Sequence, residues 1–147
     1  MNEMEELYRE IILDHNKRPR NFHAMEDATH HADGHNPLCG DEIEVFVKVE
    51  GGKIADISFQ GEGCAISKSS ASLMTSALKG KTLDEAKREC GIVVAMLTGK
   101  TDSIPDELGD IAALQGVRQF PARIKCATLS WHTLEESLQG GKTASTE

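Results

Sequence analysis

The clearest pattern in the chain is an alternation of aliphatic side chains over residues 43–49. The aliphatic positions are Ile43, Val45, Val47 and Val49. A period of two predicts a half-buried β-strand. Gly51-Gly52 supplies the positive φ of a tight turn, and residues 54–59 then carry Ile54, Ile57 and Phe59. The sequence therefore predicts a β-hairpin.

Other segments carry apolar side chains at helical spacing, which predicts amphipathic helices. Their expected ranges are 3–15, 65–80, 82–98, 121–138 and a shorter one over 103–114. Thr82 followed by Glu85 forms a capping-box pattern, and Pro121 suits the first turn of a helix. We expect one domain over 1–140 and a flexible tail over 141–147.

The net charge and the short apolar runs limit which partners and which cellular location are expected. The chain has 147 residues and a formal net charge of −8, so a nucleic-acid partner is not expected. No apolar run approaches the ~20 residues of a membrane span. The amino-terminal segment is acidic and amphipathic, unlike a secretory signal. These features predict a cytoplasmic protein, in which four cysteines indicate metal or thiol chemistry rather than disulfides.

The strongest candidate for chemistry is the pair Cys39 and Asp41. Gly40 between them permits a sharp turn, so that both side chains could converge on one cation. Cys64 and Cys126 follow at expected helix starts, where helix dipoles favour a thiolate. Three thiolates and one carboxylate would form a closed zinc site or an iron–sulfur site. Cys39 is predicted to be its reactive member.

For the histidines of residues 23–35 and for Cys90, the sequence favours ordinary structural roles over metal binding. His23, His30, His31 and His35 lie in a polar stretch without zinc-finger spacing. Solvated histidines in a loop or edge strand are favoured over metal ligands, with His35 expected nearest to the site. Cys90 lies within an expected helix and is interpreted as a packing residue.

Three cysteine motifs in this order resemble the U-type iron–sulfur cluster assembly proteins, the SufU/IscU (NifU N-terminal-like) family. The motifs are NPLCGD at 36–41, GEGCAIS at 61–67 and GVRQFPARIKCATL at 116–129. The scaffold branch, IscU-like, has a histidine directly before its third cysteine. This chain has Lys125 there and a long segment from Gly91 to Gly116, which is similar to the zinc-dependent sulfurtransferase branch, SufU.

The resemblance implies an α+β fold with a small antiparallel sheet of about three strands and helices mainly on one side. It implies a zinc site formed by Cys39, Asp41, Cys64 and Cys126, with Cys39 receiving sulfur as a persulfide. Arg123 matches an arginine near the site, although a surface salt bridge is equally open. The implied partners are a SufS-type cysteine desulfurase and other Suf cluster-assembly proteins. The loops around Cys39 and the basic stretch 17–20 are candidate docking surfaces.

Two other functions stay open at this point. The same residues could assemble a transient [2Fe–2S] cluster on a scaffold that passes it to apo-proteins, because thiolates ligate such clusters well. Alternatively, the site could be a structural zinc module that ties loops to the sheet.

Overall fold

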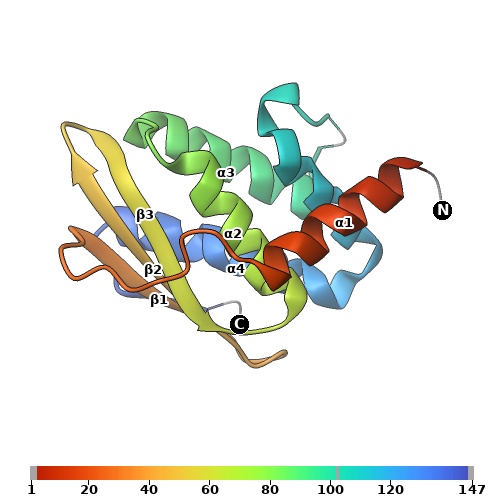
Figure 1. The fold of residues 1–147 in the computed structure, drawn as a ribbon, viewed down its shortest axis with the longest axis horizontal. Helices are drawn as coiled ribbons and strands as arrows, with labels where there is room; N and C mark the ends of the chain where they lie inside the picture. Colours follow the sequence, from red (N-terminus) through yellow and green to blue (C-terminus); the bar gives the residue numbers. More distant parts are fainter. Residues whose placement is uncertain (1–2, 102, 146–147) are drawn as a thin grey trace.

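The computed structural model describes residues 3–101 and 103–145, which form four α-helices, a four-stranded sheet and one 3-10 segment (Figure 1). In order they are α1 (Glu3–Lys17), β1 (His30–Asn36), β2 (Asp41–Glu50), β3 (Lys53–Glu62), α2 (Ala65–Leu78), α3 (Leu83–Leu97), η1 (Asp106–Gln119), α4 (Pro121–Leu138) and β4 (Thr143–Ser145).

The expected hairpin is confirmed by the antiparallel pairing of β2 and β3, in which Val45 lies opposite Phe59. The strand order is β3-β2-β1-β4, and β1 is antiparallel to β2. The sheet therefore has four strands rather than about three. It is also mixed rather than purely antiparallel, because β4 pairs in parallel with β1.

Strand β1 is the element that the apolar pattern marked least clearly. Its inward positions are the small residues Ala32 and Gly34 and then the buried Asn36, while its outward positions are polar. Small residues face the helices because α4 packs very closely there. A Cβ on Gly34 would lie 2.0 Å from Thr133 Oγ1. An apolar side chain, the usual strand signal, does not fit at this position.

The carboxyl-terminal segment, expected to be a flexible tail over 141–147, contributes β4. The amide of Asp33 donates to the carbonyl of Lys142 at 2.8 Å, and residues 143–145 continue this pairing with β1. A strand of three residues is too short to show a period of two. Residues 146–147 lie outside the described residues.

The core lies between the sheet and the helices that cover one of its faces (Figure 1). Alternation in β2 directs Ile43, Val45 and Val47 toward these helices. Helix α2 packs against α4 through a buried polar link. Trp131 Nε1 donates to Ser70 Oγ at 3.0 Å, and that hydroxyl donates to the carbonyl of Ala127 at 2.6 Å. Because α4 also packs on β1 and β2, the sheet, α2 and α4 meet near the cysteine motifs.

The four longer expected helices are confirmed, and each begins and ends within two residues of prediction. Thr82 and Glu85 form the predicted capping box at the start of α3. The expected short helix is instead a longer 3-10 segment, η1, which is broken at Gly109, where φ is 54°. No helix among residues 3–101 and 103–145 is both long and apolar enough to cross a membrane.

Candidate metal centre

The turn between β1 and β2 carries Cys39 and leads into Asp41. The amides of Cys39 and Gly40 both donate to the carbonyl of Asn36, at 3.2 and 2.9 Å. Gly40 has a φ of 72°, which places it in the left-handed region that glycine adopts without strain. The predicted sharp turn is therefore present. It leaves Cys39 half-buried in the turn, beyond the last residue pair of the two strands, Asn36 and Asp41.

Asp41 is buried and fully anchored by neighbouring amides. Its Oδ1 accepts a hydrogen bond from the backbone N–H of Cys64 at 2.9 Å, and its Oδ2 accepts from Asn36 Nδ2 at 3.0 Å. A Cβ on Gly63 would lie 2.7 Å from Asp41 Oδ1, so glycine is needed there for this approach. The carboxylate is thus held at the junction of β1, β2 and the start of α2.

Cys126 enters the same place from α4 and is buried. Its Sγ accepts a hydrogen bond from Asn36 Nδ2 at 3.3 Å, so one side-chain amide holds both Asp41 and Cys126. Burial raises the pKa of the Cys126 thiol far above its ordinary value, and hydrogen bonds with Asp41 and Cys39 raise it further. A bound cation would reverse this effect, because metal coordination favours a thiolate.

The chemistry of the donor set fits a thiophilic cation. One ligand atom each from Cys39, Asp41 and Cys126 lie within 4.8 Å of one another. Since Zn–S bonds are about 2.3 Å long, two sulfurs on one tetrahedral zinc ion are about 3.8 Å apart. The three ligand atoms therefore need only small adjustments to share one ion.

Cys64 does not belong to this converged group. It is the N-cap of α2, as its predicted place at a helix start requires, and its Sγ accepts the amide of Ser67 at 3.4 Å. Its backbone is nevertheless adjacent, since its own N–H binds Asp41. The structure therefore brings together three of the four expected ligands and leaves the fourth at the edge.

Arg123, in the first turn of α4, contacts the centre at Cys39. Its Nη1 donates to Cys39 Sγ at 3.5 Å, which favours a role at the site over a remote salt bridge. A hydrogen bond with Cys126 and the proximity of Cys39 and Cys64 raise the pKa of Arg123. The guanidinium would offset the negative charge of a thiolate formed at Cys39.

The other candidates lie elsewhere. Cys90 is buried in α3, and burial raises the pKa of its thiol, in agreement with a packing role. His35 follows the alternation of β1 onto the outer face, where its Nδ1 lies 3.9 Å from Glu42 Oε1. It is therefore next to Asn36 in sequence but faces away from the centre.

The sequence pattern assigns no role to Asn36 or Gly34, whereas the glycines beside Cys64, Gly61 and Gly63, are expected to permit a close backbone approach. Asn36 was part of a motif, but only the pairing of Asn36 with Asp41 across β1 and β2 shows that its amide reaches two ligands. The approach of Gly63 to Asp41 agrees with that expectation, but no local pattern signals the approach of Gly34 to Thr133.

Comparison with known proteins places the chain in a family. The family model of the NifU-like N-terminal domain matches residues 7–127. The chain therefore belongs to the NifU-like N-terminal domain family, which includes iron–sulfur cluster assembly scaffold proteins.

Individual relatives support the same assignment. The chain is 48% identical over 135 residues to the zinc-dependent sulfurtransferase SufU of Bacillus subtilis, covering 92% of this chain and 91% of that protein. It is 40% identical over 144 residues to the iron–sulfur cluster assembly scaffold protein IscU of Streptococcus pyogenes, covering 98% and 90%. A crystal structure of a candidate assembly scaffold for the SUF system of Fervidobacterium islandicum superposes with a TM-score of 0.83 at 34% identity, covering 91% and 98%.

Proposed function

We propose that this chain accepts persulfide sulfur on Cys39 from a SufS-type cysteine desulfurase in the cytoplasm and relays it to other Suf proteins for cluster assembly. The observation that supports this most directly is the position of Cys39. Cys39 is half-buried in an exposed turn, whereas Cys126, which shares its site, is buried, and Cys64, which is also half-buried, caps α2. The named activity of the Bacillus subtilis relative, a zinc-dependent sulfurtransferase, supports the same function.

The resident metal of this proposal is Zn²⁺, held by Cys39, Asp41, Cys64 and Cys126. Bound zinc would keep the coordinating thiols deprotonated at neutral pH. Cys64 would join the set by exchanging its N-cap hydrogen bond with Ser67 for a metal bond. Asn36 would orient two of the ligands, as it does in the structure.

The transfer itself is a thiol exchange on a sulfane sulfur. The Cys39 thiolate attacks the terminal sulfur of the donor's persulfide, and a new S–S bond forms at Cys39. The S–S bond of the donor breaks, and the donor cysteine leaves as a thiolate. No net oxidant is consumed, because the oxidation state of the transferred sulfur is unchanged. Arg123 Nη1, 3.5 Å from Cys39 Sγ, would first hold the attacking thiolate in place and then the persulfide anion that forms on it.

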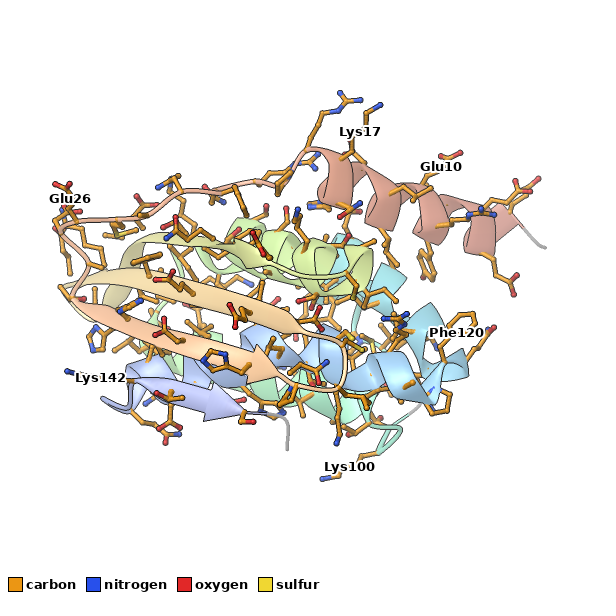
Figure 2. All side chains as sticks on the ribbon, turned by 90° about the horizontal axis from the view of Figure 1, so that it is seen from below. Glu10, Lys17, Glu26, Lys100, Phe120 and Lys142 are labelled. Carbon is orange, nitrogen blue, oxygen red and sulfur yellow. The ribbon has the colours of Figure 1, made fainter. Side chains whose placement is uncertain are left out.

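Exposed apolar side chains beside the centre suit the docking of a partner protein. Leu38, next to Cys39, is 71% exposed. Phe120, which is labelled in Figure 2 at the start of α4, is 58% exposed. The basic stretch 17–20 is a weaker candidate than its sequence indicates. Arg18 and Arg20 both pair with Asp14, at 3.7 and 2.6 Å, so much of the local positive charge is compensated.

The test combines metal analysis with a sulfur-transfer assay. Zinc-loaded protein is incubated with a cysteine desulfurase, cysteine and a mild reductant. We expect about one zinc per chain, faster desulfurase turnover and a persulfide on Cys39. The faster turnover and the persulfide should both vanish in Cys39→Ala and persist in the matched control Cys90→Ala. Zinc binding without either effect would overturn the proposal in favour of a structural zinc module.

A second candidate is a scaffold for a [2Fe–2S] cluster, favoured by the name of the Streptococcus pyogenes relative. In that function the cluster is cargo rather than a resident cofactor. Bound iron and sulfide that pass to an apo-ferredoxin, without stimulation of the desulfurase, would identify it.

A further inference from the structure

A second group of metal-ligating side chains lies on the outer face of the sheet, away from the cysteine centre. It consists of His31 and Asp33 on β1 and Glu44 on β2, and one ligand atom from each lies within 4.8 Å of the other two. Alternation along β1 and β2 places these side chains on the face opposite the helices. These two strands lie in the foreground of Figure 2.

The imidazole of His31 is held in one orientation. Its ring stacks on Phe46, with centroids 4.7 Å apart and an interplanar angle of 14°. In this orientation Nε2 lies 3.2 Å from Glu44 Oε2 and 3.3 Å from Asp33 Oδ1. In a tetrahedral complex with bonds of about 2.0–2.1 Å, neighbouring ligand atoms are about 3.3 Å apart. The two separations from Nε2 are therefore compatible with ligands around one ion, and the two carboxylates lie within 4.8 Å of each other.

One carboxylate oxygen of this cluster accepts no hydrogen bond while His31 Nε2 donates to Glu44. His31 Nε2 can donate one hydrogen, and its hydrogen bond is with Glu44. Asp33 Oδ1 is shielded from solvent and lies 3.3 Å from the same nitrogen, but no hydrogen bond to it is formed among the described residues. A shielded carboxylate oxygen without a donor is costly. An ion between the three side chains would satisfy both carboxylates and accept the lone pair of a neutral imidazole.

We propose that His31, Asp33 and Glu44 form a second, surface site for a divalent transition-metal cation, with Zn²⁺ as the representative. One imidazole and two carboxylates suit zinc and ferrous ions rather than the soft ions that thiolates select. The remaining coordination positions face solvent, because the three side chains are each 40–46% exposed. A metal ion at this site can therefore exchange with solvent. The cysteine centre differs in that two of its three converged ligands, Asp41 and Cys126, are buried. The surface site does not depend on the proposed sulfur transfer.

The proposed site would give His31 a role beyond the one expected from the sequence. The histidines of residues 23–35 were interpreted as solvated, and His23 and His30 contact only Ala24 and Thr29 in the interactions described for them. His31 differs because the pairing of β1 with β2 brings Glu44 next to it, an arrangement that the spacing of the histidines does not show.

The experiment adds Zn²⁺ to protein whose cysteine centre is already loaded with zinc. The ¹⁵N signals of all histidine rings are followed by NMR, and binding is measured by calorimetry. We expect a saturable shift of His31 Nε2 and one additional equivalent of zinc. Affinity for this equivalent should fall at least about tenfold in His31→Asn, Asp33→Asn and Glu44→Gln. It should be unchanged in His23→Asn, the matched control.

Two outcomes would overturn the proposal. In one, the Zn²⁺-induced shifts are spread equally over several histidines. In the other, Glu44→Gln and Asp33→Asn bind the additional zinc as tightly as the parent. Because these two substitutions are nearly isosteric and exposed, and leave the stack of His31 on Phe46 in place, a folding defect is not expected to obscure the result. Sulfur transfer by Cys39 should be unaffected in all three site variants, which separates this test from that of the proposed function.

Discussion

Gly34 of β1 lies so close to Thr133 of α4 that a Cβ on the glycine would stand 2.0 Å from the threonine Oγ1. Thr133 cannot easily retreat, because its hydroxyl is buried and donates to the carbonyl of Leu129 at 2.7 Å. Cys126 lies two helical turns before Thr133 and so shares the face that meets the sheet. The absence of a side chain at Gly34 thus sets the distance at which α4 delivers Cys126 to Asp41.

Gly34→Ala should therefore lower the free energy of unfolding by about 1–3 kcal/mol, the usual cost of overpacking. Urea denaturation measures this loss. Gly91→Ala is the control: Gly91 is exposed in α3 with open space around its Cβ position, so alanine should add about 0.5–1 kcal/mol. Thr133→Ala in the Gly34→Ala background should recover part of the loss. If the two substitutions lowered the free energy of unfolding by strictly additive amounts, the close approach of Gly34 to Thr133 would not be the cause of the loss.

Asn36→Ala should weaken zinc binding by about 10–100-fold, because the Asn36 amide donates to both Asp41 Oδ2 and Cys126 Sγ. Competition with a chromophoric chelator measures the affinity. Asn36→Asp keeps the shape but places a second carboxylate where the amide donates, so it should not restore binding. Parent-like affinity in Asn36→Ala would show that the two ligands do not need this orientation.

Much of this arrangement follows from local pattern, and the rest follows from contacts between distant segments. The β2–β3 hairpin and the capping box at Thr82 have strong local signals, and both are present. Strand β1 gave no such signal, because its inward positions are small where α4 approaches. The motifs indicated the candidate ligands, but only the tertiary structure shows that Asn36 links two of them while Cys64 caps its own helix.

Alkylation should separate the cysteines by accessibility. Cys39 is half-buried in a turn, whereas Cys90 is buried in the core and burial raises the pKa of its thiol. In native metal-free protein, iodoacetamide should modify Cys39 and leave Cys90 intact until denaturant is added, because the thiolate is the reactive form. Peptide mass spectrometry reads out both sites. Bound zinc should slow the modification of Cys39, and modification of Cys90 in the native protein at a comparable rate would contradict its packing role.

His15 should make stability fall at mildly acidic pH. Its side chain is 6% exposed, and burial lowers the pKa of the imidazole, with the charge of Arg20 acting in the same direction and those of Asp14 and Asp110 opposing it. Ser72 Oγ accepts the amide of Arg20 at 2.8 Å, so its own hydrogen is free for His15 Nδ1 at 2.7 Å. Protonation of Nδ1 would break this arrangement.

Because the pKa of His15 is lower in the folded state, the unfolded chain binds the proton more readily. Stability from this group is complete above the unfolded pKa of about 6.5 and declines as the pH falls toward the folded pKa. Urea denaturation at pH 7.5 and 5.5, chosen as about one unit either side of 6.5, should show a steeper loss in the parent than in His15→Gln. Since the metal ligands are common to both proteins, their difference isolates His15. His132→Gln, which alters a half-exposed imidazole, should follow the parent, and a His15→Gln profile parallel to the parent would show that His15 is not the titrating group.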